Sequence, residues 1–188
     1  MCRTGSAPFF GDWRGALLSD VRGFVLEVGA GSGPNLDRYP AGVSLVATEF
    51  NEESIVQAKR SMAKPKASAR IRLASADIEH LAFPDNTFDA AVATLVFCSV
   101  ERPVDGLREV MRVLKPGSKF YMIDHVRSHH ARLARLQDKL NSRWYRWAEG
   151  CNLNRDTEAN VRAAGFALEY LSVRYLGLIK TMVALKPN

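Results

Sequence analysis

Cysteine is scarce in this chain of 188 residues, and its three cysteines, Cys2, Cys98 and Cys151, include no closely spaced pair. An odd count without a CxxC pair argues against a disulfide framework and a zinc knuckle, so no metal-ligand cluster is expected. The sequence also lacks a basic-then-apolar leader at its start and an apolar run of membrane-spanning length. We therefore expect a soluble protein in the reducing cytoplasm.

Internal repeats and low-complexity segments are also missing, which excludes solenoids and long linkers. The length corresponds to a single domain, residues 1–188. Apolar residues make up 47% of the chain and charged residues 24%, which is typical of a globular protein with a full core. The net charge of +6 favours anionic partners. Nucleic acid is not expected, because no nucleic-acid module is recognisable.

Short apolar or β-branched segments alternate with longer helical patterns along the chain. The expected strands are residues 24–28, 43–48, 70–76, 88–94, 119–123, 167–173 and 178–185. The expected helices are residues 55–62, a segment that begins at Pro103 and ends at Pro116–Gly117, and residues 131–147 and 156–164. Strand–helix alternation followed by two adjacent strands predicts an α/β fold whose mostly parallel sheet has an antiparallel edge.

The most specific motif is the glycine-rich segment LEVGAGSG, residues 26–33, directly after the first expected strand. Glycines at this point allow the backbone to approach a ligand closely. A dinucleotide fingerprint would need a third glycine where Pro34 stands, and a phosphate-binding P-loop would need GK[ST], so both are excluded. Glu27 would repel a pyrophosphate but suits a cationic ligand.

Two further acids stand at expected strand ends, Glu49 after the second strand and Asp77 after the third. In a doubly wound sheet, ligands gather beyond the carboxyl ends of the strands, and an acid about 20 residues after the glycine loop reaches ribose hydroxyls. Three acids beside a glycine loop predict a pocket for a positively charged nucleoside, which S-adenosylmethionine fits. The alternative interpretation is that each acid only caps a strand or helix.

Four segments carry a family resemblance: VLEVGAGSG (25–33), TEFN (48–51), ASADIEHLAFPDNTFD (74–89) and LREVMRVLKPGSKFYMIDHV (107–126). They resemble the class I S-adenosylmethionine-dependent methyltransferases of the ubiquinone/menaquinone-biosynthesis type. The resemblance implies a Rossmann-like, seven-stranded, mostly parallel sheet in the order 3-2-1-4-5-7-6, with the last strand antiparallel and helices on both faces.

The resemblance also implies a cofactor site for S-adenosylmethionine. In it, Glu27 and the loop residues Gly29, Ala30, Gly31 and Gly33 bracket the methionine part. Glu49 binds the ribose, with Phe50 beside it, and Asp77 and Ile78 hold the adenine. Thr94 and Leu95 line the methyl-donor side.

Three shorter segments, TLVFCSV (94–100), DHV (124–126) and GCNLNRDT (150–157), are similar to a narrower group, the alkyl-thiol S-methyltransferases and their small bacterial relatives. This resemblance implies methyl transfer to a small, largely apolar molecule, with a thiol as the first candidate acceptor. Two alternatives stay open. One is N- or C-methylation of a lipid-like or quinone acceptor, and the other is a cofactor-binding protein without turnover.

His125 and Cys98 are the candidate catalytic residues, because they follow the fifth and fourth expected strands at the rim of the pocket. Positioning alone can contribute about 7–11 kcal/mol to an in-line methyl transfer, so a thiolate or amine acceptor needs no strong base. His125 could accept a proton near neutral pH, and Cys98 could contact the substrate. The competing interpretations are a structural hydrogen bond for His125 and a small buried apolar role for Cys98.

Two segments predict amphipathic helices. Apolar residues recur at helical spacing within 131–147, and basic residues repeat one position earlier (Leu133, Leu136, Leu140, Trp144 and Trp147; Arg132, Arg135, Lys139, Arg143 and Arg146). We expect residues 127–150 to cap the substrate pocket or to contact anionic lipid, with an ordinary packed helix as the alternative. Phe9, Phe10, Trp13 and Leu17 predict a short helical cap within residues 1–22.

Overall fold

The computed structural model describes residues 11–62, 69–148 and 150–188. Its strands are β1 (Phe24–Val28), β2 (Ser44–Glu49), β3 (Arg70–Ser75), β4 (Phe88–Thr94), β5 (Leu114–His125), β6 (Ala167–Arg174) and β7 (Ile179–Leu185). Its helices are α1 (Gly11–Leu18), α2 (Glu52–Met62), α3 (Pro103–Val113), α4 (Ala131–Trp147) and α5 (Thr157–Ala163). The expected elements are confirmed, with bounds that differ mostly by a few residues.

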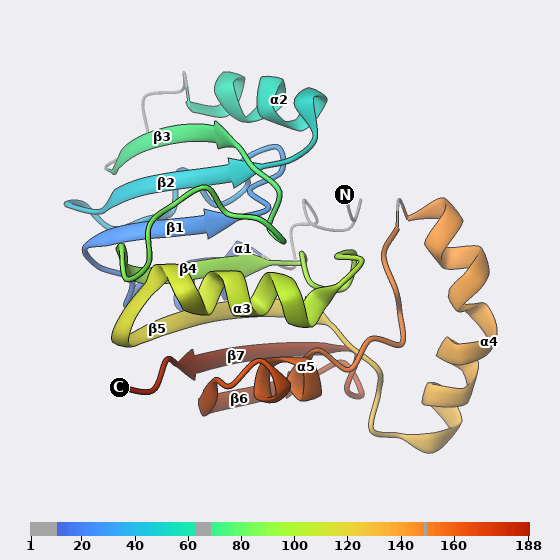
Figure 1. The fold of residues 1–188 in the computed structure, drawn as a ribbon. Helices are drawn as coiled ribbons and strands as arrows, with labels where there is room; N and C mark the ends of the chain where they lie inside the picture. Colours follow the sequence, from blue (N-terminus) through green and yellow to red (C-terminus); the bar gives the residue numbers. More distant parts are fainter. Residues whose placement is uncertain (1–10, 63–68, 149) are drawn as a thin grey trace.

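The strands form one seven-stranded sheet in the order β3-β2-β1-β4-β5-β7-β6 (Figure 1). The pairs among β1 to β5 are parallel, whereas β7 runs antiparallel to both β5 and β6. This arrangement confirms the predicted order and the antiparallel edge. The order reverses between β1 and β4, and such a switch point is where an open α/β sheet binds its ligand.

The start of β5 differs from the sequence-based expectation. Helix α3 ends at Val113, and the KPG segment that was expected to end the helix lies inside β5, which begins at Leu114. Leu114 pairs with Phe88, and the register then shifts so that Lys119 pairs with Ala90. The extra residues form an irregularity in the strand, where Gly117 adopts a φ of 71°.

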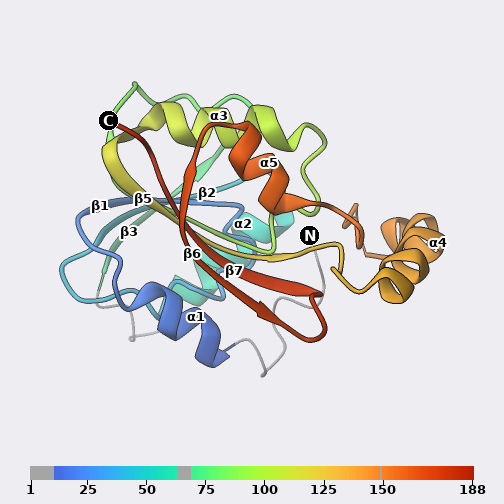
Figure 2. The same cartoon turned by 90° about the horizontal axis from the view of Figure 1, so that it is seen from below.

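Helices cover both faces of the sheet, with α3 and α5 on one face and α1 and α2 on the other (Figure 2). Successive residues of β1 therefore point into different cores: Leu26 and Val28 pack with residues of α3 and α5, and Val25 packs with residues of α1 and α2. Burial on both faces explains why β1 is an almost continuous apolar run. Both cores thus pack directly against β1, whose carboxyl end leads into the glycine loop.

Helix α4 projects from the body of the molecule (Figures 1 and 2). Its buried residues are Ala134 and Gln137, whereas Leu136, Leu140 and Trp147 of the apolar stripe are exposed. Gln137 anchors the helix, because its Nε2 donates to the carbonyls of Val126 and Leu153 and its Oε1 accepts from the Ser128 N–H. Trp144 of the same stripe is half-buried and packs against Cys98, Ala148 and Cys151, so the apolar stripe packs onto the body of the protein only in part.

The remaining helical expectation concerns the chain start. Trp13 and Leu17 lie in α1, where Leu17 is buried against the sheet, and Phe9 and Phe10 lie outside the described residues. Within the described parts of the chain, no helix combines the length and apolar character needed to cross a bilayer.

Candidate active site

A cavity of about 480 Å³ opens at the switch point, beyond the carboxyl ends of β1, β2, β3 and β4. Its volume falls within the range of roughly 300–1,000 Å³ found for small-molecule sites. Six residues expected at the cofactor line it: Gly29, Glu49, Phe50, Asp77, Ile78 and Leu95. The remaining lining residues are Thr48, Asn51, Ala76, Glu79, Val96, Ser99, Val100 and Glu101, which the sequence analysis did not single out. They flank the expected positions in the same loops.

Glu49 is held in a fixed orientation at the cavity and is only 8% exposed. Its Oε1 accepts hydrogen bonds from the N–H groups of Phe50 (3.0 Å) and Asn51 (2.9 Å), and its Oε2 accepts one from the Gly31 N–H (2.9 Å). An ionised carboxylate has about four acceptor sites, so these bonds leave Oε2 with one acceptor site. Glu49 can therefore accept one hydrogen bond from a ligand hydroxyl.

Gly29 forms the wall of the cavity next to the end of β4. Its φ is 62°, in the left-handed region that disfavours side chains, and a Cβ atom here would lie 2.6 Å from Cγ2 of Val96. Both constraints require glycine at this position. The close contact with Val96 brings the backbone after β1 directly to the cavity surface.

Asp77, Ile78 and Phe50 supply the far side of the cavity, after β3 and β2. Asp77 Oδ1 accepts a hydrogen bond from the Glu79 N–H (2.9 Å), while its Oδ2 lies 3.7 Å from the exposed His80 Nδ1. Phe50 is 75% exposed, so its ring is accessible to a ligand. An aromatic base between these residues would gain apolar contact from Phe50 and Ile78 and an acceptor from Asp77.

Glu27 lies beneath the site and does not line the cavity, with 1% of its surface exposed. Its Oε1 accepts from Asn35 Nδ2 (2.6 Å) and its Oε2 accepts from the Tyr39 hydroxyl (3.0 Å). Burial raises the pKa of Glu27 to about 7, although these hydrogen bonds and the charge of Arg14 oppose the rise. The expected contact of Glu27 with the methionine part stays a prediction.

A buried arginine that the sequence analysis missed lies beside Glu27. Arg14 of α1 donates from Nη1 to Asn35 Oδ1 (2.7 Å) and to Thr94 Oγ1 (2.5 Å), and Asn35 Nδ2 also donates to Thr94 (3.0 Å). Thr94 is thus part of a buried network and does not line the cavity. No motif surrounds Arg14, so only the packing of α1 onto the sheet could identify it.

The other loop residues expected at the cofactor support the cavity from behind. Ala30 is buried, Gly31 donates its N–H to Glu49, and a Cβ atom on Gly33 would lie 2.5 Å from Cδ1 of Leu36. None of the three lines the cavity. The glycine loop therefore shapes the site mostly through its backbone.

Cys98, His125 and Cys151 come together at the same rim, from the ends of β4 and β5 and the loop after α4. Their sulfur and ring nitrogen atoms all lie within 4.8 Å of one another, with 3.7 Å between Cys151 Sγ and His125 Nδ1. The sequence analysis did not expect these three side chains to lie together. These residues stand 26 to 53 positions apart, so their proximity has no spacing signature in the sequence.

Asp124 supports this cluster from the buried end of β5. Its Oδ2 accepts from Thr157 Oγ1 (2.9 Å), and its Oδ1 accepts from the backbone N–H of His125 (3.1 Å). Burial raises the pKa of Asp124 to about 6, while the charge of His125 and hydrogen bonds from Thr157 and Cys98 oppose the rise. The carboxylate fixes the backbone that carries His125.

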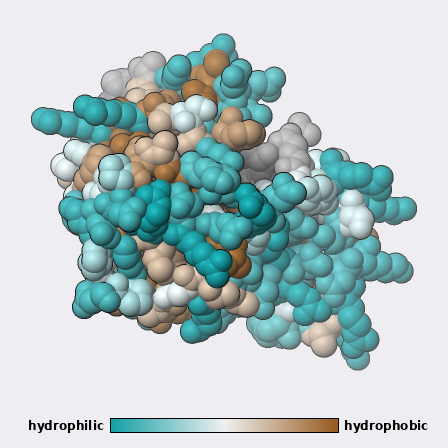
Figure 3. All heavy atoms as spheres, viewed as in Figure 1, coloured by the Kyte–Doolittle hydropathy of each residue, from teal (hydrophilic) through white to brown (hydrophobic). Residues whose placement is uncertain are grey.

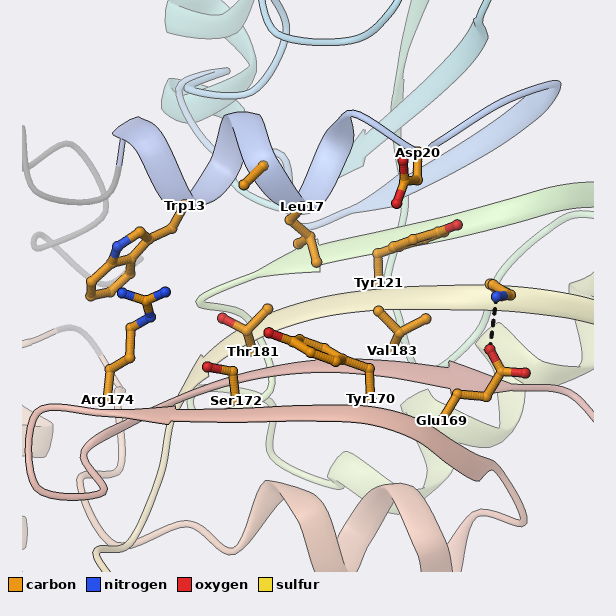
Figure 4. Close-up of a pocket in the computed structure, with 12 residues that line it drawn as sticks. Trp13, Leu17, Asp20, Tyr121, Glu169, Tyr170, Ser172, Arg174, Thr181 and Val183 are labelled. Atoms are coloured by element: carbon orange, nitrogen blue, oxygen red, sulfur yellow. Dashed lines mark ion pairs between the residues drawn. The ribbon is translucent and has the colours of Figure 1, made fainter.

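A larger groove of about 680 Å³ lies elsewhere, between α1 and strands β5, β6 and β7 (Figure 4). Trp13 and Leu17 face the side chains of the strands across it, and the Arg174 guanidinium lies 5.0 Å from the centre of the Trp13 ring. An ion pair of 2.8 Å joins Lys119 and Glu169 at one end. This groove contains neither the glycine loop nor the strand-end acids, so the smaller cavity is the candidate active site.

The methyltransferase domain model matches residues 26–122, more than half of the chain. The chain therefore belongs to the S-adenosylmethionine-dependent methyltransferase family. The matched segment contains the cavity from Gly29 to Glu101.

Two named relatives are thiol S-methyltransferases, TMT1B of Rattus norvegicus (34% identical) and TMT1A of Homo sapiens (33% identical). Each alignment covers 76% of this chain and 59% of the relative. The chain thus spans less than two thirds of these relatives. A solved methyltransferase structure from Methanosarcina mazei shares the fold, with a TM-score of 0.71 and 21% identity over 96% of this chain and 98% of that one.

S-Adenosylmethionine is the cofactor of this family, and the residues of the cavity fit it. Glu49 Oε2 offers one acceptor to a ribose hydroxyl, and the exposed face of Phe50 together with Ile78 offers apolar contact to the adenine. The carboxylates of Glu49, Asp77 and Glu101 make the lining acidic, which suits a sulfonium cation, whereas Glu79 is paired with Arg102. When bound, the cofactor supplies an electrophilic methyl group.

Proposed function

We propose that this chain transfers the methyl group of S-adenosylmethionine to the sulfur of a small, largely apolar thiol. The acidic cavity at the switch point, with Glu49 fixed by three backbone N–H groups, carries the methyl-transfer part of the proposal. The similarity to thiol S-methyltransferases supports the choice of sulfur as the acceptor atom.

The proposed orientation places the adenine between Phe50 and Ile78 and the ribose at Glu49. The methionine part then extends along the glycine loop past Gly29, and the methyl group faces the residues after β4, among them Leu95 and Ser99. The protein binds and orients the cofactor and excludes water. A thiolate acceptor needs no strong base, because in-line positioning can supply much of the rate.

His125 and Cys98 stay candidate catalytic residues under this proposal. His125 is half-buried at the end of β5 and could accept the proton of an acceptor thiol. Cys98 is fully buried, and its Sγ lies 3.6 Å from the Oγ of the cavity residue Ser99. Both therefore lie next to the side of the cavity where we place the acceptor.

We also propose that residues 127–150 cap the acceptor side of the site. Trp144 of α4 packs against Cys98, Ala148 and Cys151, so the C-terminal end of the helix contacts this rim directly. Asn141 of α4 holds the loop after the helix through two hydrogen bonds. Its Nδ2 donates to Asn152 Oδ1 (3.0 Å), and its Oδ1 accepts from the Leu153 N–H (2.8 Å).

A second proposal concerns a membrane surface. The exposed Leu136, Leu140 and Trp147 of α4 support peripheral contact with anionic lipid, because Arg135 and Arg143 are exposed on the same helix. In the view of Figure 3, the surface over α4 is mainly hydrophilic, as expected where its charged residues reach solvent. Lipid contact would bring an apolar or lipid-like acceptor to the capped rim.

The test is an acceptor screen with the full chain and S-adenosylmethionine, in which release of S-adenosylhomocysteine is measured for small thiols, amines and phenols. We expect release with apolar thiols and its loss in Glu49→Ala. Turnover confined to amines or phenols would contradict the thiol assignment. No release with any class, together with tight cofactor binding, would favour a binding protein without turnover.

A further inference from the structure

The rim beside the cofactor cavity holds two buried cysteines and a histidine whose polar atoms face one another. Cys98 follows β4, His125 ends β5, and Cys151 lies in the loop after α4. We propose that these three residues bind a zinc ion through Cys98 Sγ, Cys151 Sγ and His125 Nδ1.

The observed spacing fits tetrahedral zinc. With Zn–S bonds of about 2.3 Å and Zn–N bonds of about 2.0–2.1 Å, neighbouring ligand atoms of a tetrahedral site lie about 3.5–3.8 Å apart. Cys151 Sγ and His125 Nδ1 are 3.7 Å apart, and the other pairs of ligand atoms lie within 4.8 Å. A shift of about 1 Å in a sulfur position closes the site, which small side-chain rotations can supply.

The local backbone holds the ligands together without the ion. The loop that carries Cys151 is tied to Cys98, because both the backbone N–H and Nδ2 of Asn152 donate to the Cys98 carbonyl (2.8 and 3.2 Å). The backbone N–H of His125 donates to the buried Asp124 carboxylate. Cys98 and Cys151 are fully buried. Two thiols and an imidazole that converge from separate segments are the kind of ligands that zinc prefers.

The number of protein ligands indicates whether the zinc ion is structural or catalytic. Structural zinc sites are closed by four protein ligands, whereas sites with three, including Cys₂His sites, keep one position for water or substrate. Among the described His, Cys, Asp and Glu residues, the group contains only these three ligands. Ser99 lines the cofactor cavity and contacts Cys98, so the zinc site adjoins the place of the methyl donor.

This role rests on the proposed function. With zinc bound, His125 is a ligand and no longer the base, and an acceptor thiol that binds the open position releases its proton to solvent, because zinc coordinates the thiolate. The thiolate sulfur then forms a bond to the methyl carbon while the bond between that carbon and the sulfonium sulfur breaks. The products are the methyl thioether and S-adenosylhomocysteine, and one proton is released for each methyl group transferred.

Zinc binding is tested with the full chain carrying Cys2→Ser, so that only the two clustered thiols remain. The reduced protein is titrated with Zn²⁺ against a chromophoric chelator, and Co²⁺ is added separately to detect thiolate-to-metal absorption. We expect one ion per chain. Cys98→Ser and Cys151→Ser should each weaken binding by more than about 100-fold, the largest loss usual for a merely supporting residue. The control His80→Gln removes an exposed histidine outside the cluster and should leave zinc binding unchanged.

A measurement on the unsubstituted cluster avoids the risk that a variant fails to fold. In the Cys2→Ser protein, Zn²⁺ should protect both remaining thiols from a thiol-specific reagent, and chelator should restore their reactivity. Absence of stoichiometric binding, equal binding by the cysteine variants, or thiols that react at the same rate with and without Zn²⁺ would overturn the site. A Cys98–Cys151 disulfide that persists under reducing conditions would also overturn it.

The two proposals fail in different ways. Zinc binding that depends on the cluster, without any thiol turnover, would keep the metal site and contradict the proposed function. Thiol methylation that is unchanged by chelation and by Cys151→Ser would keep the function and overturn the role of zinc in it. Turnover that falls on chelation and returns with Zn²⁺ supports both.

Discussion

The backbone N–H of Gly31 donates a hydrogen bond of 2.9 Å to Oε2 of Glu49 and so joins the glycine loop after β1 to the acid at the end of β2. The two features that the sequence analysis identified separately are therefore one unit. The loop orients the acid, and the acid stabilises the loop. Binding of a ligand to Glu49 therefore depends on the conformation of both the loop and the acid.

We expect Glu49→Ala to weaken binding of S-adenosylmethionine by about 10- to 100-fold. A hydrogen bond to a charged group is worth roughly 1.5–3 kcal/mol, and the freed loop N–H groups lose a preorganised partner as well. Isothermal titration calorimetry with the cofactor and with S-adenosylhomocysteine measures the change. The control variant Glu53→Ala removes an exposed acid from α2 and should leave the affinity for the cofactor unchanged. Unchanged affinity in Glu49→Ala would refute the role in ribose binding.

Gly29→Ala should be much more destabilising than Gly42→Ala, although both residues have positive φ angles. Each substitution imposes backbone strain of about 1–2 kcal/mol. Only at residue 29 does the new Cβ also overlap Val96, whereas nothing lies within 4 Å at residue 42. Urea unfolding measures the difference. Adding Val96→Ala to Gly29→Ala should recover part of the loss, and no recovery would contradict a steric cause.

The fold was predictable because its signals are local. The apolar runs of β1 and β4, the breaks at Gly29 and Gly165, and the lack of a helix-sized gap between β6 and β7 predict an α/β fold with an antiparallel edge. The strand order itself followed from the resemblance to the methyltransferases. The strand-end acids could also be placed, since parallel strands bring their carboxyl ends to one edge. Glu49 and Asp77 accordingly line the cavity.

The sequence does not predict contacts between residues that lie far apart in the chain. Arg14 donates a hydrogen bond to Thr94, 80 positions away in the sequence, and Cys151 contacts His125, 26 positions away. The partial packing of the α4 stripe has a related cause: the pattern shows which residues are apolar, but the hydrogen bonds of Gln137 also determine which side of the helix faces the protein. A polar anchor of this kind has no periodicity to detect.

The free energy of unfolding should fall with rising pH because of Glu27. Its pKa is about 7 in the folded protein and ordinarily 4.5, so the folded state holds more protons between these values. Stability from this group is therefore complete below pH 4.5 and is lost as the pH rises through 7. The shift corresponds to about 3 kcal/mol. Arg14, Tyr39 and Glu49 are the charged or titratable groups that act on it.

Chemical denaturation of the wild type and of Glu27→Gln from pH 4.5 to 8 measures this effect. The glutamine keeps an acceptor for Asn35 but carries no titrating proton, so the stability of the wild type relative to the variant should decline across this range. The exposed Glu53→Gln serves as the control. A difference between wild type and Glu27→Gln that does not change with pH would contradict the expected titration.

Charge reversal on α4 tests the membrane proposal. Arg135→Glu combined with Arg143→Glu should abolish co-sedimentation with vesicles of anionic lipid, because each basic residue near such a surface contributes about 1 kcal/mol. The matched control, Lys59→Glu with Arg60→Glu, reverses the same number of charges in the last turn of α2. Equal loss in both variants would indicate that net charge rather than α4 governs binding. No binding by the wild type would remove the proposal.

The most direct test of the account is an experimental structure of the full chain with S-adenosylhomocysteine. We predict a ribose hydroxyl within hydrogen-bond distance of Glu49 Oε2, the adenine against Phe50 and Ile78, and the sulfur atom on the side of Ser99. A nucleoside bound in the groove between α1 and β6, or in the predicted cavity with its ribose away from Glu49, would contradict the account.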